Sequence, residues 1–167
     1  MNKRLIGFLV ALLLVLLPTG IVGAATTADI TVNATPQYIS ISVNVSTYDF
    51  STVAESSVTN TTAGYFGITN DSTVQTDQTV SVTTTNWTGG VGWVHSDTCT
   101  PGVATAGMKA QRVGQSWVIV KNGSPNYIYE NCAASTSYSF ALSLHAPTTM
   151  TDGVEKSIVV RVSAAAG

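Results

Sequence analysis

Charge is scarce in this sequence, and no stretch of it is basic. Of 167 residues only 10% are charged, with seven bases against nine acids. The absence of a basic patch argues against nucleic acid as a partner. Solubility must therefore rest on uncharged polar groups, which the chain supplies as 25 Thr and 17 Ser.

Sustained helical periodicity is missing beyond the N-terminal segment. The recurring pattern is alternation with period two, which is typical of half-buried β-strands. Thr suits such strands because its branched Cβ packs well on a pleated surface. The alternating apolar positions, which we expect to face the core, are Ile39, Ile41, Val43, Val45, Phe66, Ile68, Val80, Val82, Phe140, Leu142, Leu144, Ile158, Val160 and Val162.

These runs predict an all-β domain. Together with Asp29–Asn33 and Trp117–Val120 they indicate a fold of about eight or nine short strands, separated by Gly, Pro, Asn and Asp clusters. Such a series is typical of a sandwich or barrel. The long polar connection Asp97–Thr105 favours the sandwich, because Greek-key crossings need connections of this kind. We expect a single sandwich over residues 37–167.

The first residues have the pattern of an export signal. Two bases precede an apolar run from Leu5 to Leu17, and Val22-Gly23-Ala24 offers the small residues that a signal peptidase reads. We expect a signal peptide over residues 1–24. An uncleaved membrane anchor is the alternative, but the run is shorter than the roughly 20 residues that cross a bilayer. The expected location is secreted or at the cell surface, with no membrane span after cleavage.

Cysteine occurs only twice, as Cys99 and Cys132. In an oxidising compartment an isolated pair most often forms a disulfide. A bond across this separation would stabilise the fold by roughly 3–4 kcal/mol. A reactive or metal-binding thiol is the alternative, but no second set of ligands lies near either cysteine in the sequence.

Acceptor triplets for N-linked glycosylation are frequent. If the source organism glycosylates asparagine, these sites would place sugar on the surface of an exported protein. The candidate positions are Asn33, Asn44, Asn60, Asn70, Asn86 and Asn122.

Three segments together resemble a known module. Tyr48-Asp49-Phe50-Ser51-Thr52-Val53, then Phe66-Gly67-Ile68-Thr69-Asn70, then Val80-Ser81-Val82 are similar to an immunoglobulin-like module of prokaryotic surface proteins. That family includes subunits of biofilm matrix fibres and of archaeal bundling pili. The resemblance covers roughly residues 38–83 and implies an immunoglobulin-like sandwich with a structural role. Ser51 stands where the family usually has glycine.

Catalytic and metal-binding motifs are incomplete. His95-Ser96-Asp97 holds the residue types of a triad, but adjacent residues do not converge as a triad does. In Gly114-Gln115-Ser116-Trp117-Val118, valine replaces the second glycine of a nucleophile elbow. We therefore expect no enzyme and no cofactor. Acidic loop residues of secreted sandwiches sometimes hold calcium, which leaves Asp71, Asp77 and Asp97 as an alternative calcium site.

Aromatic residues form the remaining candidate site. Trp87 and Trp93 flank a glycine-rich loop, and Tyr127 and Tyr129 follow later. Exposed aromatic faces stack on sugar rings, so these residues suggest carbohydrate binding. The alternative, which we favour, is that at least one Trp plugs the core while the others pin the loop.

The architecture favours a self-assembling filament or surface-matrix subunit over an adhesive, polysaccharide-binding module. The N-terminal arm over residues 25–36 contains Ile30 and Val32 in strand-like alternation, and Pro36 separates it from the next strand. Such an arm could add to the open sheet edge of a neighbouring copy. The alternative is that Asp29–Asn33 is the first strand of the same domain.

Overall fold

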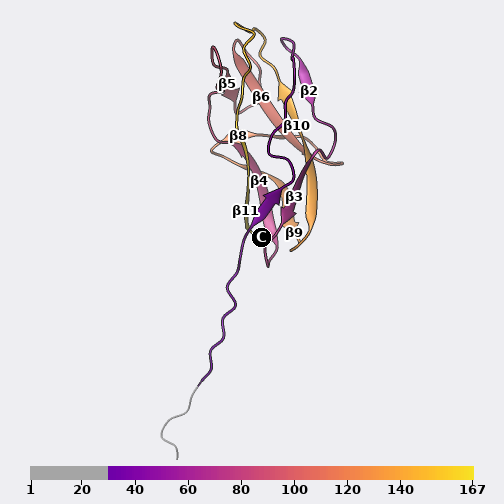
Figure 1. Cartoon of the computed structure of the whole chain (residues 1–167), viewed down its shortest axis with the longest axis vertical. Helices are drawn as coiled ribbons and strands as arrows, with labels where there is room; N and C mark the ends of the chain where they lie inside the picture. Colours follow the sequence, from indigo (N-terminus) through magenta and orange to yellow (C-terminus); the bar gives the residue numbers. More distant parts are fainter. Residues whose placement is uncertain (1–29) are drawn as a thin grey trace, which may run out of the picture. The chain divides into compact units, whose positions relative to one another are not determined.

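The computed structural model describes residues 30–167, and that part of the chain has no helix and two β-sheets (Figure 1). The expected all-β fold is confirmed. Both sheets belong to a unit that runs from Pro36 to Gly167, while a separate unit ends at Thr35. The expected signal peptide over residues 1–24 lies outside the described residues. Within residues 30–167 no helix is long and apolar enough to cross a membrane.

Seven strands form the larger sheet, here called sheet A. Its order is β1-β3-β10-β6-β5, with β2 also on β10 and β7 also on β6. Since β2 and β3 pair with different parts of β10, they share one of its edges and leave the other to β6. The strands are β1 (Ile41–Val43), β2 (Val58–Asn60), β3 (Phe66–Asn70), β5 (Val94–Ser96), β6 (Thr105–Arg112), β7 (Val118–Ile119) and β10 (Ser137–His145).

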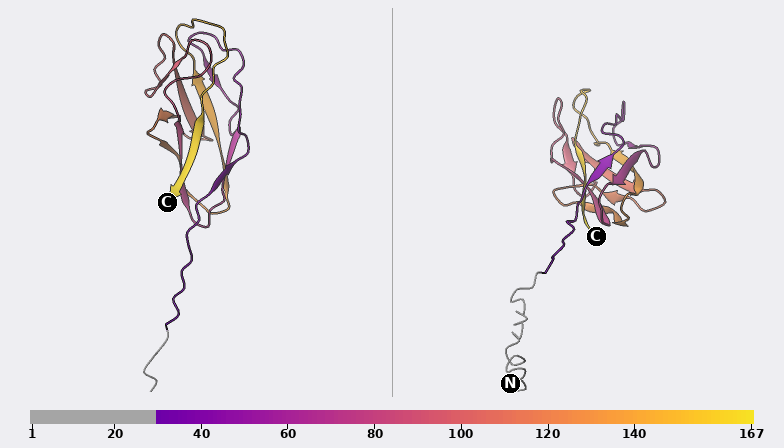
Figure 2. Two further views of the ribbon diagram at one scale, coloured as in Figure 1. Left: turned by 60° about the vertical axis from the view of Figure 1, so that its left-hand side comes forward. Right: turned by 60° about the horizontal axis from the view of Figure 1, so that its bottom comes forward.

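Four strands form the smaller sheet, sheet B, and all of its pairs involve β4. β11 lies on one edge of β4, and β8 and β9 pair with β4 as well. The strands are β4 (Thr76–Val82), β8 (Lys121–Asn122), β9 (Asn126–Cys132) and β11 (Val160–Ala166). Figure 2 shows two further views of these strands, with the chain ending at the tip of β11.

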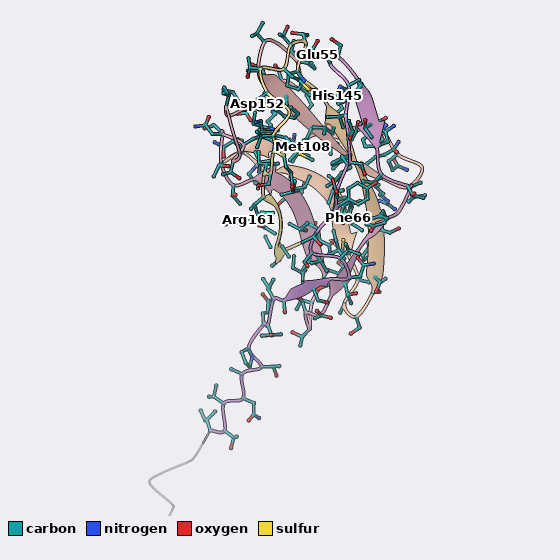
Figure 3. The ribbon with its side chains drawn as sticks, turned by 45° about the horizontal axis from the view of Figure 1, so that its top comes forward. Glu55, Phe66, Met108, His145, Asp152 and Arg161 are labelled. Carbon is teal, nitrogen blue, oxygen red and sulfur yellow. The ribbon has the colours of Figure 1, made fainter. Side chains whose placement is uncertain are left out.

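The hydrophobic core takes its side chains from both sheets. Ile68, Met108 and Leu142 of sheet A pack in one buried cluster with Val80 and Val82 of sheet B. Met108 is labelled in Figure 3 among the side chains of this unit. The predicted inward positions on β3, β4 and β10 are all buried, so the period-two pattern located these strands correctly.

The pattern was wrong at two places. Ile39 and Val43, expected in the core, are exposed because β1 is a three-residue edge strand that pairs only with β3. Conversely, Ala141 and Ser143 on the opposite face of β10 are buried. Both are small, and longer side chains lie directly opposite them on the neighbouring strands. These are Gln111 beside Ala141, and Lys109 and Asn60 beside Ser143.

The strand β6 was not predicted at all. Its inward side chains Ala106, Met108 and Ala110 are buried, yet none is β-branched or aromatic. Position 107 requires glycine for a steric reason, because a Cβ there would lie 2.7 Å from the Cα of Cys99. Small residues give a weak strand signal, so only the pairing with β10 reveals this element.

Ser51 adopts a backbone conformation that favours glycine. Its φ is +58°, and its N–H donates to Oδ1 of Asp49 at 2.7 Å. Glycine reaches positive φ without a steric penalty, so the backbone here is compatible with that residue.

The expected disulfide is absent. Cys99 and Cys132 are both free and buried. Cys99 packs on Gly107, and Gly107 pairs with His145 at one end of β10. Cys132 lies elsewhere, where its carbonyl accepts a hydrogen bond from Nδ2 of Asn70. The backbone N–H of Asn70 bonds Thr136, just before the other end of β10. At roughly 3.3 Å per residue a nine-residue strand is far longer than the roughly 7 Å that a disulfide spans between Cα atoms.

We predict that the folded protein keeps two unreactive thiols. Burial raises the pKa of both Cys99 and Cys132, and the thiolate is the reactive form. A thiol reagent at neutral pH should therefore label the native protein slowly and should label two thiols per chain in denaturant. A reductant should leave the melting temperature unchanged. Finding no free thiol in denaturant would show that the cysteines are paired after all.

The buried positions in the first half of β4 carry polar side chains. Thr76 and Gln78 are fully buried, and no hydrogen bond within the described residues engages Oγ1 of Thr76 or either amide atom of Gln78. On the same strand Val80 and Val82 are buried among apolar groups. An unpaired buried amide costs about 1–3 kcal/mol, so the side chain of Gln78 lowers the stability of the fold.

Replacing Gln78 should therefore stabilise the fold. We expect Gln78→Met to raise the free energy of unfolding by about 1 kcal/mol, because it removes an unpaired amide while keeping most of the volume. Urea unfolding measures the change. The matched control is Gln75→Met at an exposed position, which should change little. A loss of stability in Gln78→Met alone would mean that the amide is hydrogen-bonded in solution.

Candidate functional site

The two tryptophans of the glycine-rich loop lie in the core. Trp87 and Trp93 are each 6% exposed, and their rings meet edge to face with centroids 5.6 Å apart. The backbone N–H of Trp87 donates to the backbone carbonyl of Trp93 at 2.8 Å. Neither indole therefore offers a free face to a sugar ring. The stacking surface suggested for Trp87 and Trp93 is not formed, and the core role that we favoured fits their burial.

The loop between these tryptophans is held by one carboxylate. Asp152 accepts hydrogen bonds from the Val91 N–H and from Nζ of Lys156, both at 2.6 Å. The bond from Lys156, followed by that from Val91, lowers the pKa of Asp152. Gly90 makes this approach possible, since a Cβ there would collide with Oδ2 of Asp152. The loop is therefore tied to the segment before β11.

The triad-like residues do not form a catalytic arrangement. Nε2 of His95 donates to the carbonyl of Val120 at 2.7 Å and lies 3.9 Å from Oδ1 of Asp97. The Ser96 hydroxyl contacts the Thr98 hydroxyl and accepts from the Thr100 N–H. The serine is thus engaged away from the histidine.

The acidic residues considered for calcium lie in separate places. Oδ1 of Asp77 accepts from the N–H of Asn131, and Oδ1 of Asp97 accepts from the N–H of Asn122. Asp71 is exposed after β3. Among residues 30–167, no three His, Cys, Asp or Glu side chains come together in a group that could hold a metal ion.

The glycosylation candidates differ in access. Asn33, Asn44, Asn60 and Asn86 are exposed, and Asn122 is half-buried. Asn70 is fully buried, and its Nδ2 donates to the carbonyls of Val74, Cys132 and Ala133. Since a glycan would be attached to that nitrogen, the folded chain cannot accept one at Asn70.

The candidate donor residues are exposed. Ile30 and Val32 are 86% and 84% exposed, and the described part of this arm, from residue 30, contains no strand. The alternative in which Asp29–Asn33 forms a first strand is not seen over residues 30–33. A separate feature of the second unit is an open edge, since β11 pairs with β4 and with no other described strand.

The two tyrosines have different environments. Tyr129 is buried, its hydroxyl accepts from the Ser139 N–H at 3.0 Å and donates to the Ser139 carbonyl, and Arg112 covers its ring at 4.8 Å. Tyr127 is 56% exposed. Only Tyr127 therefore retains an accessible ring of the four aromatic residues suggested for sugar stacking.

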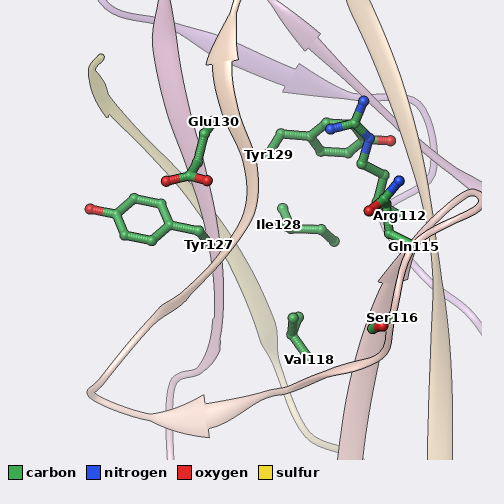
Figure 4. Close-up of a pocket in the computed structure, with 8 residues that line it drawn as sticks. All are labelled: Arg112, Gln115, Ser116, Val118, Tyr127, Ile128, Tyr129 and Glu130. Carbon is green, nitrogen blue, oxygen red and sulfur yellow. The ribbon is translucent and has the colours of Figure 1, made fainter.

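Tyr127 lies at the edge of a hollow between β6, the turn after it, and β9 (Figure 4). This β6–β9 hollow has a volume of about 450 Å³. Figure 4 shows Tyr127 and Glu130 on one side of it, with Arg112 and Gln115 on the other. Its lining residues are Arg112, Gln115, Ser116, Val118, Tyr127, Ile128, Tyr129 and Glu130.

Sequence reasoning missed most of this hollow. Arg112 ends β6, Gln115 and Ser116 follow in a turn, and Glu130 comes from β9. Ser116 was considered only as a nucleophile. No motif joins these residues, because only the packing of β9 beside β6 and β7 brings them together.

His145, a titratable residue, is the last residue of β10. His145 pairs with Gly107 and Val58. Partial burial, and then the positive charge of Lys109, lower the pKa of His145 below its usual 6.5. The folded state therefore favours the neutral ring.

This shift predicts a loss of stability in mild acid. Below about pH 6.5 His145 takes up a proton in the unfolded chain more readily than in the folded chain. The free energy of unfolding is therefore highest above that pH and falls as the pH drops toward the pKa of His145 in the folded state. Urea unfolding from about pH 7.5 to about pH 5 should show a smaller decline in His145→Gln than in the wild type. Equal declines would contradict the assignment.

No protein-family model, no curated protein and no solved structure matches this chain.

Proposed function

We propose that this protein is a secreted structural subunit that self-assembles at the cell surface, with the N-terminal arm of one copy adding to sheet B of the next. The observation that carries the proposal is the exposure of Ile30 and Val32 in strand-like alternation. Fully burying an aliphatic side chain of this size is worth about 1.5–3 kcal/mol. A neighbouring copy that covers both side chains would supply that free energy.

The acceptor in this proposal is the outer edge of β11. The strand is seven residues long and carries one charge, Arg161, and no proline. Natural edge strands are usually protected by charge, proline or short length. β11 has little of this protection, which supports its role as a docking edge for an extended segment.

The alternation of hydrogen bonds between β11 and β4 shows which backbone groups of β11 have no partner on β4. The N–H of Thr83 donates to the carbonyl of Val159, and the N–H of Gly167 donates to the carbonyl of Gln75. In an antiparallel pair the bonded residues alternate, so odd-numbered residues of β11 face β4. The even-numbered residues therefore direct their N–H and C=O groups outward; they are Val160, Val162, Ala164 and Ala166.

The resemblance to surface-fibre subunits agrees with this role, and so does the expected export signal. The other expectations that belong to the proposal are glycosylation at the accessible asparagines and an immunoglobulin-like arrangement of the strands. Each can be tested on the secreted protein independently of assembly.

We predict that the mature chain forms filaments or large oligomers and that two separate changes abolish them. Deleting residues 25–35 removes the donor. Ala164→Pro removes one outward N–H of the acceptor while sparing the bonds to β4. Light scattering and negative-stain images should then show folded monomers. Two matched controls, Ala164→Ser and Thr31→Ser, keep the backbone groups and should still assemble.

A monomeric mature protein would refute self-assembly. Assembly that survives Ala164→Pro but not the deletion would place the acceptor on another edge. Circular dichroism of each variant separates a failure to assemble from a failure to fold.

A further inference from the structure

We infer that the β6–β9 hollow binds a neutral saccharide, with one pyranose unit seated between its two sides. This site is independent of the proposed assembly, because it lies beside β9 whereas the proposed acceptor edge belongs to β11. Its volume of about 450 Å³ lies within the range of about 300–1,000 Å³ that is usual for small-molecule sites.

The hollow offers an apolar surface of the kind that sugar rings contact. Val118 lines it and is half-buried, Ile128 is buried and adds little surface, and Tyr127 is 56% exposed. A pyranose presents C–H groups on its ring faces, and these pack on aliphatic and aromatic side chains. Tyr127 is therefore the aromatic contact that we assign to the ligand.

Both sides of the hollow carry hydrogen-bonding groups that are free of protein partners. Within the described residues no hydrogen bond or ion pair engages the guanidinium of Arg112, the carboxylate of Glu130 or the side-chain amide of Gln115. Arginine only donates, an ionised carboxylate only accepts, and the amide does both. Sugar hydroxyls also donate and accept, so this mixture matches a polyol.

The charge of the lining favours an uncharged ligand. Arg112 and Glu130 are its two ionised side chains and have opposite signs. A ligand with a net charge would be attracted by one of them and repelled by the other. A neutral sugar contacts both without that penalty.

Arg112 is positioned before the ligand arrives. Its guanidinium lies 4.8 Å from the ring centre of Tyr129, a cation–π arrangement. The hydroxyl of Tyr129 is bonded to the backbone of Ser139 on β10. A side chain that is already ordered loses less conformational entropy on binding, which favours its use as a sugar contact.

The test is isothermal titration calorimetry of the whole mature chain. The probes are methyl glycosides of glucose, galactose, mannose and N-acetylglucosamine, with glucuronate as the charged comparison. We expect at least one neutral glycoside to bind with millimolar affinity. Tyr127→Ala and Glu130→Gln should each weaken that binding about tenfold or more. The matched control is Tyr38→Ala, which removes a tyrosine of similar exposure, 59%, outside the hollow and should bind like the wild type.

Three results would overturn the inference. They are the absence of binding by every neutral glycoside, unchanged binding in both Tyr127→Ala and Glu130→Gln, and binding of glucuronate alone. Retained binding in Ala164→Pro would show that the site works without assembly. The saccharide site and the proposed filament therefore fail or succeed separately.

Discussion

All strand pairs of sheet B depend on β4. β11, β8 and β9 each hydrogen-bond to this strand, and its inward residues Val80 and Val82 also pack against sheet A. Because β4 uses both of its own edges, the outer edges of β11, β8 and β9 have no partner strand among the described residues. A narrow sheet of this kind leaves every strand except β4 with one unpaired edge.

Two of these strands, β11 and β9, differ in the groups that they present. β11 is regular, nearly uncharged and half-buried on its inner side, which suits backbone pairing with another extended segment. β9 is bulged against β4, and its side chains Tyr127 and Glu130 line a hollow together with groups from β6. One edge therefore favours association through the main chain, and the other favours recognition through side chains.

The interior of the domain is uneven. Trp87, Trp93 and Met108 belong to the hydrophobic cluster, whereas Thr76, Gln78 and Asn70 are polar side chains that are also fully buried. Asn70 satisfies its amide with three carbonyls, but the amide of Gln78 has no partner among the described residues. The indole Nε1 of Trp87 is also buried without a partner among the described residues, so unpaired polar groups occur beside the tryptophans as well.

The amino-acid pattern by itself determined the fold class and the strands that alternate strongly. β3, β4 and β10 were predictable because Phe66, Val80 and Leu142 belong to period-two runs whose apolar face must leave water.

Only the tertiary structure decided the rest. β6 is a strand because β10 pairs with it, not because its alanines favour one. The cysteines are separate because they lie at opposite ends of β10, a distance that sequence spacing does not encode. The β6–β9 hollow exists because Arg112 and Glu130, distant in sequence, meet where two strands pack side by side. Local patterns report burial, whereas these features depend on which segments become neighbours.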